Sequence, residues 1–266
     1  MTSSNGIKHS IAIASGKGGV GKSTISVNLA VALAQTGAVT GLLDADVYGP
    51  SIPMMTGVRR MPRNDGHKIL PLEAHGIRLM SLGFLMPDGA PTVWRGPLVA
   101  GAVQQLLRDV AWGELDYLLI DLPPGTGDAQ LTLAQSLPLT GAVIVATPQL
   151  VAMQIATKAL AMFRQLKVPI LGIVENMSQF VCPHCGSTSP IFRRGGGRRA
   201  SASLGVPFLG EIPLDPLVCQ ASDHGEPIPT MHPNSAVAKA LHDVAGNLVQ
   251  RILAEAAAAP VIRTGP

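Results

Sequence analysis

Short, uniformly apolar runs alternate with longer segments of mixed polarity along most of the chain. Because these runs are apolar at nearly every position, rather than at every second one, they predict strands buried on both faces of a parallel sheet. The predicted strands are residues 10–14, 39–43, 116–120, 142–146, 168–174 and 207–212. The mixed segments predict helices at residues 25–35, 98–110, 149–166 and 235–254. This order indicates an α/β fold: a doubly wound, mostly parallel sheet with helices on both faces.

The section 58–97 is the least regular part of the chain. Two short strands are predicted there, at 68–72 and 77–82, and loops containing Pro and Gly flank them. We expect a hairpin or an excursion at the edge of the sheet. Arg95, near the end of this section, is either a phosphate-sensing or interface residue or an exposed charge.

Composition restricts the class of protein further. At 266 residues the chain is long enough for one large α/β domain, 1–266, and it shows no internal repeat and no extra N-terminal domain. A net charge of +3 is too small to indicate nucleic-acid binding. Three cysteines do not make a secreted disulfide framework, and no apolar run resembles a signal peptide or a membrane span. We therefore expect a cytoplasmic protein without a membrane or nucleic-acid partner.

A glycine-rich loop lies between the first predicted strand and the first predicted helix. Its sequence, SGKGGVGKST, fits G-x-x-x-x-G-K-[ST] in the strand–loop–helix context that this motif requires. The glycines let successive N–H groups point at a phosphate, Lys22 reaches the β- and γ-phosphates, and the Ser23 hydroxyl ligates Mg²⁺. The fold is therefore that of a P-loop NTPase. The residues expected to bind ATP here are Gly16, Lys17, Gly18, Gly19, Val20, Gly21, Lys22, Ser23 and Thr24.

Carboxylates follow two of the predicted strands, where an open α/β sheet places its ligand. Asp46 is expected to hold a magnesium-bound water or to orient the attacking water, and Asp121 to bind Mg²⁺ through a water as a Walker B residue. Asp44 is a second candidate, although Asp44 or Asp46 could instead cap the turn that follows. Gly125, just after Asp121, is expected to offer its N–H to the γ-phosphate.

Two further positions are expected near the base of the nucleotide. Asn176 follows a predicted strand on the nucleotide side, and its amide can donate to and accept from the edge of adenine at once. Pro213 begins the loop after the last predicted strand, and we expect that loop to flank the base.

A second chemical signal is Cys182-Pro183-His184-Cys185-Gly186, in a loop predicted between a strand and a helix. Two thiols separated by two residues can bind one metal centre, but a tetrahedral zinc site or a cubane cluster needs about four protein ligands. Cys219 is distant in sequence. The simplest completion is a second chain that brings the same two cysteines to a twofold axis. A surface turn with free thiols and a structural zinc knuckle remain as alternatives.

The loop with its additional lysine, Lys17, resembles that of the deviant Walker A ATPases, which reads KGGxGK[ST]. In that class the extra lysine crosses a dimer interface and touches the partner's ATP, in the manner of an arginine finger. The resemblance implies a catalytic role for Lys17 beside Lys22 and Asp46. The alternative is a solvated lysine on a loop.

Six segments occur along the chain in the order KGGVGKST, DADVYGPSIP, DLPPGTGD, ENM, CPHCG and LGEIPLD. Together, and over nearly the whole chain, they resemble the Mrp/ApbC family of P-loop ATPases, which carry iron–sulfur clusters to apoproteins. The resemblance implies a homodimer with ATP and Mg²⁺ at its interface and a 4Fe-4S cluster bridging Cys182 and Cys185 of both subunits. It also supports the adenine-reading role of Asn176. The family's usual IFGxGG after the cysteines is IFRRGG here, at 191–196.

Other functions share part of this pattern. A surface-cycling positioning ATPase of the MinD/ParA type would have the same loop but no use for the cysteines. An electron-donating reductase of the nitrogenase type would need cysteines near 121–128, where there are none. One basic stretch has no assigned role and is expected to be a loop with a solvated helix start, or else a contact with a partner or nucleotide. It consists of Arg193, Arg194, Arg198 and Arg199.

Overall fold

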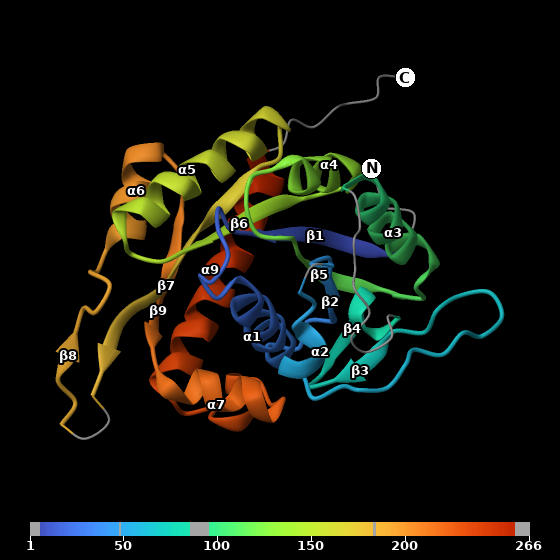
Figure 1. Ribbon diagram of the computed structural model, residues 1–266, viewed down its shortest axis with the longest axis horizontal. Coiled ribbons are helices and arrows are strands. Elements are labelled where there is room, and N and C mark those ends of the chain that lie inside the picture. Colours follow the sequence, from blue (N-terminus) through green and yellow to red (C-terminus); the bar gives the residue numbers. More distant parts are fainter. Residues whose placement is uncertain (1–5, 48, 86–95, 183–184, 259–266) are drawn as a thin grey trace.

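The computed structural model describes residues 6–47, 49–85, 96–182 and 185–258 (Figure 1). Within them the chain forms a nine-stranded sheet in the order β3-β4-β2-β5-β1-β6-β7-β8, with β9 also paired to β7. Except for β3 and β8, which pair antiparallel with β4 and β7, neighbouring strands are parallel. The strands are β1 (Ile7–Ala14), β2 (Thr40–Asp44), β3 (Leu72–Ala74), β4 (Ile77–Ser81), β5 (Leu115–Asp121), β6 (Gly141–Ala146), β7 (Ile170–Val181), β8 (Thr188–Ser189) and β9 (Phe208–Leu214).

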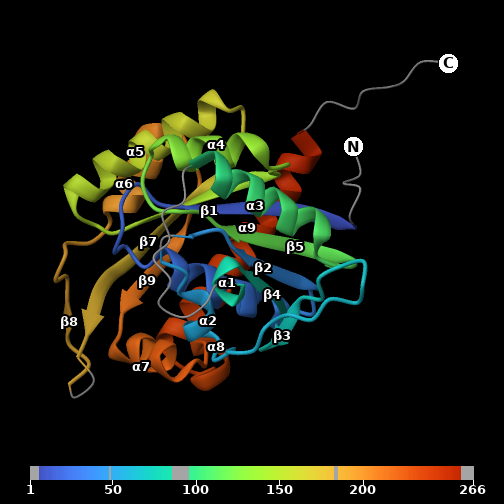
Figure 2. The ribbon, with the colours of Figure 1, turned by 45° about the vertical axis from the view of Figure 1, so that its right-hand side comes forward.

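Helices cover both faces of this sheet, as Figures 1 and 2 show. α3, α4, α5 and α6 lie on one face, and α1 and α9 lie on the other together with the shorter α2, α7 and α8. The helices are α1 (Lys22–Gln35), α2 (Ile52–Met55), α3 (Gly96–Asp109), α4 (Asp128–Ser136), α5 (Leu150–Gln165), α6 (Gly196–Leu204), α7 (Pro216–His224), α8 (Ile228–Met231) and α9 (Ala236–Ala258), with a short 3₁₀ turn at Leu82–Phe84. The predicted α/β architecture is confirmed.

The core explains why the strands read as continuous apolar runs. Every residue of β2 and of β6 is buried, because helices pack on both sides of these central strands. Aromatic residues are few, so aliphatic side chains and Ala fill most of the interior, and Trp112 and Phe163 are its largest fully buried side chains. Among the described residues, none of the helices combines the length and the apolar character that a bilayer crossing requires.

The irregular section forms the edge hairpin that its pattern predicts. β3 and β4 pair antiparallel, with Leu72 opposite Leu79, while β4 pairs parallel with β2. The first strand begins later than the predicted 68–72, because Ile69 makes only isolated bridges, to Asn64 and Val110. Arg95 lies outside the described residues.

One departure from the predicted elements is β7; others are α4 and α7, which the sequence pattern did not predict. The sequence predicts a strand at 168–174, but β7 continues to Val181 and leaves the sheet as a two-stranded hairpin with β8. Asn176 therefore lies inside a strand rather than after one, and the two cysteines lie at a hairpin tip rather than in a strand-to-helix loop. The strand is irregular at Met177, whose φ is 57°, and its pairing with β9 shifts register between Asn176 and Phe180.

Candidate functional site: a phosphate-binding loop and a two-thiol hairpin

The loop between β1 and α1 has a backbone that its glycines make possible. Gly19 and Gly21 have φ of 76° and 80°, in the left-handed region, and Gly21 is the residue that precedes α1. A Cβ at Gly21 would also lie 2.3 Å from Nδ2 of Asn176. Asn176 is buried, and its Nδ2 donates to the carbonyl of Val20 at 2.9 Å, so β7 directly supports the loop.

A cavity of about 190 Å³ opens against this loop, at the carboxyl ends of β1, β2 and β5. A Cβ built on Gly18 or Gly19 would meet no atom within 4 Å, so both backbones are open to a ligand. Together with the N-terminus of α1, these groups suit the polyphosphate of a nucleotide. The cavity is lined by Ser15, Lys17, Gly18, Gly19, Gly21, Lys22, Ser23, Thr24, Asp46, Ser51, Met55 and Pro124.

Asp121 is the centre of a buried polar network beneath the cavity. Its Oδ2 accepts from Lys22 Nζ at 2.7 Å and from Ser23 Oγ at 2.6 Å. Its Oδ1 accepts from Ser26 Oγ at 2.5 Å. Lys22 Nζ also lies 3.9 Å from Asp46 Oδ2, so one ammonium group joins both predicted magnesium-site carboxylates.

Sequence reasoning did not find Ser26. The signal available was a hydroxyl one helical turn beyond Ser23, on a helix whose neighbouring positions are otherwise apolar and buried. Spacings of three and four residues bring side chains to the same face of a helix. Ser23 and Ser26 can therefore hold opposite oxygens of Asp121.

Asp44 lies next to Asp121, as its register partner on β2, and it is fully buried. Burial first, and then the charge of Asp121, raise the pKa of Asp44 to about 8. Its carboxyl group contacts Ser81 Oγ at 2.9 Å and accepts from the backbone N–H of Asp46 at 3.1 Å. A raised pKa favours the protonated form of Asp44, and its hydrogen bond with the N–H of Asp46 closes the turn that positions Asp46, which fits the capping alternative.

Two other predicted contacts are found in a different setting. The N–H of Gly125 donates to the carbonyl of Ser15 at 3.0 Å, so in this structure it faces the chain rather than the cavity. Pro213 belongs to the end of β9, which is hydrogen-bonded to β7, and Ile212 beside it is the register partner of Asn176. The last strand is thus longer than predicted, and Pro213 neighbours the strand that supports the loop.

The two cysteines flank the tip of the β7–β8 hairpin. The backbone N–H of Cys182 donates to the carbonyl of Ser187, and the N–H of Gly186 donates back to Cys182, both at 2.9 Å. Cys185 is exposed, with its Sγ 3.3 Å from Ser187 Oγ. Hydrogen bonds from the hydroxyl and then the backbone of Ser187, followed by one with Cys182, lower the pKa of Cys185. A lowered pKa favours the thiolate, which is the form that binds metals.

The third cysteine does not join this pair. Cys219 is exposed on α7, and its Sγ lies 3.7 Å from Asp223. Within the described ranges there is no group of three or more His, Cys, Asp or Glu side chains arranged to hold a metal ion. The hairpin of one chain thus offers two sulfur ligands, as the sequence predicts.

The doubly wound sheet, the glycine-rich loop at the start of α1 and the buried Lys22–Asp121 pair define a P-loop NTPase. A sequence model of the family described as "ParA: NUBPL iron-transfer P-loop NTPase" matches residues 6–249. The chain belongs to this family of iron-transfer P-loop NTPases.

Individual relatives agree with this assignment. An "Iron-sulfur cluster carrier protein" of Deinococcus radiodurans is 54% identical over 249 residues, which are 93% of this chain and 71% of the relative. The "Iron-sulfur protein required for NADH dehydrogenase, mitochondrial" of Arabidopsis thaliana is 51% identical over 248 residues, 92% of this chain and 79% of the relative.

Solved structures show the same fold. A nucleotide-binding protein from Archaeoglobus fulgidus in complex with ADP is 44% identical, with a TM-score of 0.74 over 82% of this chain and 87% of that chain. The cell division ATPase MinD of Pyrococcus furiosus has a TM-score of 0.70 at 24% identity, covering 91% and 99% of the two chains, and supports the fold alone.

Proposed function

We propose that this protein is an ATP-hydrolysing iron–sulfur cluster carrier that works as a homodimer in the cytoplasm. ATP binds between two subunits, and a 4Fe-4S cluster, the cargo, is held by Cys182 and Cys185 of both chains before delivery to an apoprotein. The observation that carries this proposal is that β7 bears both features. Asn176 supports the phosphate-binding loop, and the same strand ends at Val181, immediately before Cys182.

Within the nucleotide site each side chain has a task that its position supports. Lys22 lies between Asp121 and Asp46 and is placed to bind the β- and γ-phosphates, while the hydroxyl of Ser23 is a ligand for Mg²⁺. Asp121 and Asp46 would hold water ligands of the metal, and Asp46 would orient the attacking water. These oxygen donors suit magnesium, which keeps several of its waters in NTPases.

Lys17 lines the same cavity, on the loop between β1 and α1, and its side chain is only partly buried there. It is therefore available to reach a phosphate of the partner's nucleotide, where a cation stabilises the charge that develops on the transferred group. In Lys17→Ala, nucleotide affinity should remain within a few-fold of the wild type while ATP turnover is lost. Unchanged turnover would contradict the role across the interface.

Adenine recognition by Asn176 and the loop at Pro213 also belongs to this proposal. Nδ2 of Asn176 is bonded to the carbonyl of Val20, and the amide oxygen would accept from the base. This position suits a residue that links base binding to the phosphate-binding loop.

Anaerobic metal and acid-labile sulfide analysis tests the cargo. Wild-type dimer should contain iron and sulfide and absorb visible light, whereas zinc without sulfide would establish the structural-knuckle alternative. Cys182→Ser should lose the iron. The matched control is Cys219→Ser, an exposed cysteine outside the hairpin, which should keep it. Full iron retention by Cys182→Ser would refute the assignment.

A positioning ATPase of the MinD/ParA type is the second candidate, because MinD of Pyrococcus furiosus has the same fold. It gives no function to the two thiols at the hairpin tip. Iron and sulfide in the purified dimer would therefore decide between the two.

A further inference from the structure

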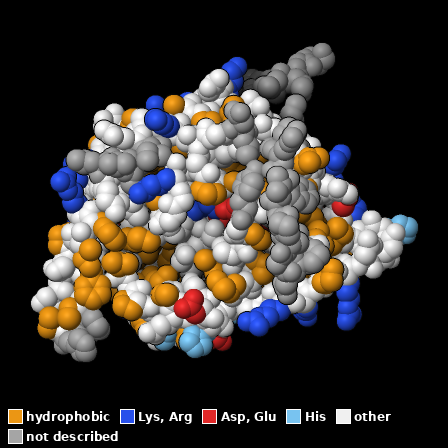
Figure 3. All heavy atoms as spheres, in the orientation of Figure 1, with side chains coloured by type: hydrophobic (Ala, Val, Ile, Leu, Met, Phe, Trp, Pro, Cys, Tyr) orange, Lys and Arg blue, Asp and Glu red, His pale blue; other side chains and the backbone are white. Residues whose placement is uncertain are grey.

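The two thiols lie in a stretch of the chain that has no acidic or strongly basic side chain. Residues 176–192 include no Lys, Arg, Asp or Glu, and Figure 3 shows mainly hydrophobic side chains over the described part of the β7–β8 hairpin. β8 is only two residues long, and it pairs with β7 at Phe180 and Val181. The return arm, which we define as residues 187–194, therefore takes little support from ion pairs or from a long strand ladder.

Glu175 marks the point at which the chain comes back to the sheet. It is a fully buried carboxylate on β7, and it accepts from the N–H of Gly195 at 2.8 Å and from the N–H of Gly197 at 2.5 Å. Glu175 and Gly195 are 20 positions apart, and Cys182 and Cys185 lie near the middle of that interval. One side chain thus closes the excursion that carries the thiols, and closing a loop restricts the positions open to its tip.

A second carboxylate holds the neighbouring residue of the return arm. Glu211 on β9 is the register partner of Glu175, and it forms an ion pair with Arg194. Like charges directly opposite each other on paired strands repel. The N–H groups at the start of α6 and the guanidinium of Arg194 offset that repulsion here. Two carboxylates on adjacent strands therefore hold consecutive positions of the chain.

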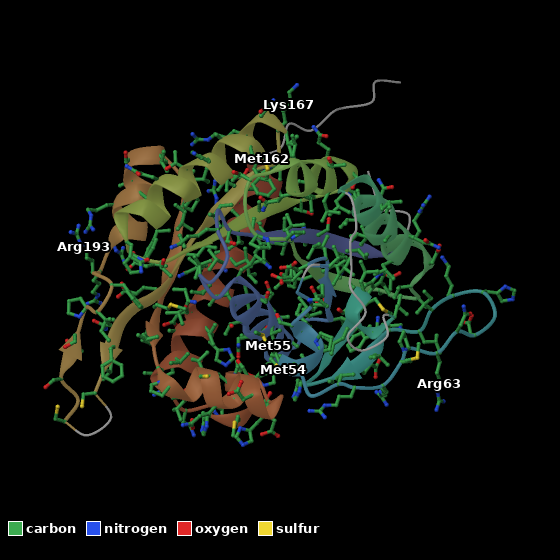
Figure 4. All side chains as sticks on the ribbon, in the orientation of Figure 1. Met54, Met55, Arg63, Met162, Lys167 and Arg193 are labelled. Carbon is green, nitrogen blue, oxygen red and sulfur yellow. The ribbon has the colours of Figure 1, made fainter. Side chains whose placement is uncertain are left out.

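The start of α6 approaches these strands closely. A Cβ on Gly196 would lie 2.5 Å from the carbonyl oxygen of Pro148, and one on Gly197 would lie 3.0 Å from Cβ of Glu175. Figure 4 places Arg193 between β8 and α6, and its φ of 74° lies in the left-handed region that disfavours residues with a Cβ. Such strain persists where the surrounding structure enforces it. The return of the chain is therefore fixed by close packing as well as by hydrogen bonds.

Asn176, the neighbour of Glu175, acts on the other face of the sheet. Successive side chains of a strand point to opposite faces. Asn176 donates to Val20 in the phosphate-binding loop before α1, whereas Glu175 bonds to the start of α6, and these two helices lie on opposite faces. Two consecutive residues of β7 thus fix the phosphate-binding loop and the return arm.

We propose that Glu175 is a positioning residue for the cluster. It holds the return arm to the sheet, so that Cys182 and Cys185 keep the mutual arrangement in which they bind the cargo. The inference rests on the proposed carrier function, and it adds a residue that acts through the hairpin rather than by contact with the cluster.

Glu175→Gln tests this role at nearly constant side-chain volume. A carboxylate accepts from both N–H groups, whereas the amide of Gln has one acceptor oxygen and would turn its own donor toward the second N–H. The return arm should therefore loosen. Glu175→Asp keeps the charge but is one methylene shorter, so it should act in the same direction to a smaller extent, and it also serves if Glu175→Gln does not fold.

Hydrogen–deuterium exchange of the metal-free protein measures the arm directly. In Glu175→Gln the amides of residues 187–194 should exchange at least about tenfold faster, and in Glu175→Asp about three- to tenfold faster, while protection in β1 and β5 stays unchanged. A purely structural role would accelerate exchange throughout the molecule. Wild-type exchange rates in whichever variants fold, or an equal acceleration everywhere, would overturn the proposal.

Anaerobic protein loaded with cluster measures the consequence for the cargo. The visible spectrum should keep its shape, because the sulfur ligands are unaltered, whereas iron removal by the ferrous chelator bipyridyl should be about five- to tenfold faster in Glu175→Gln. The matched control is Ser201→Ala, which weakens the other end of α6, where Ser201 Oγ donates to the carbonyl of Val206. This control should release iron at the wild-type rate.

Equal release from Glu175→Gln and wild type would overturn the proposal, and so would an equal acceleration in Ser201→Ala, because general loosening of α6 would then explain the effect. The two proposals fail separately. Wild-type protein without iron and sulfide would count against the carrier function alone, since the exchange rates of the metal-free protein would still decide whether Glu175 holds the return arm.

Discussion

Removing the hydroxyl of Ser26 should lower the free energy of unfolding by more than the loss of a buried serine hydrogen bond to a neutral acceptor would. Ser26 is fully buried on α1, and its Oγ donates to Asp121 Oδ1 at 2.5 Å. In Ser26→Ala that oxygen loses its donor, while Lys22 and Ser23 remain on the other oxygen. A hydrogen bond to a charged group contributes about 1.5–3 kcal/mol, against about 1 kcal/mol for a neutral one.

The matched control is Ser201→Ala. Ser201 is also a buried helical serine, but its Oγ donates to a neutral acceptor, the carbonyl of Val206. Both substitutions change helix propensity alike, so the difference between them isolates the interaction with the carboxylate. We expect Ser26→Ala to lose about 1–2 kcal/mol more free energy of unfolding than Ser201→Ala.

Urea unfolding followed by circular dichroism, without nucleotide or Mg²⁺, measures both variants. Titration calorimetry with ATP should then show weaker binding in Ser26→Ala when Mg²⁺ is present and a smaller change when it is absent, because the substitution loosens Asp121. Equal free energies of unfolding in the two variants would refute the reasoning that this hydroxyl fixes the buried carboxylate.

Two further predictions concern neighbours of this network. The pKa of Asp44 is raised from 3.8 to about 8, so the folded state binds more protons than the unfolded state between these values, and stability falls as pH rises through that window. Asp44→Asn should remove this loss. Its free energy of unfolding, measured without metal, should exceed that of the wild type by up to ~5 kcal/mol at pH 8 and by nothing at pH 3, since one pKa unit is about 1.4 kcal/mol. A difference that stays constant across pH would contradict the assignment. Gly21→Ala should lower the free energy of unfolding by at least ~1–3 kcal/mol and abolish most nucleotide binding, because its Cβ would lie 2.3 Å from Asn176 Nδ2 at a φ of +80°. The control is Gly246→Ala on α9, which has open space around it and should raise the free energy of unfolding by up to ~1 kcal/mol in the same assays.

The sequence predicts those parts of the molecule whose signals are local. The central strands are apolar throughout because both faces are covered, so their positions come within a few residues of the observed ones. The phosphate-binding loop is also encoded locally, in the glycines around Lys22 and the helix that follows. These two features together give the class of protein.

Features that depend on tertiary contacts could not be predicted in the same way. β7 becomes polar after residue 174, at Glu175 and Asn176, because these side chains bond to α6 and to the phosphate-binding loop rather than to solvent. The hydrophobic pattern therefore predicts only the first half of this strand. The helix α7 did carry a local signal that was missed: Asp215 caps it by accepting from the N–H of Leu217 at 2.9 Å, and Pro216 is its first residue.

The irregularity at Met177 divides β7 into two parts that strand pairing holds to different extents. From Asn176 to Cys182 a strand extends about 20 Å, and the left-handed residue and the register shift fall within the first part of that distance. The portion nearer the sheet pairs with β6 on one side and β9 on the other, whereas the outer portion is paired mainly with the two residues of β8. In the proposed homodimer, a tilt of this outer portion would bring the thiols toward the second copy without a change in the nucleotide pocket.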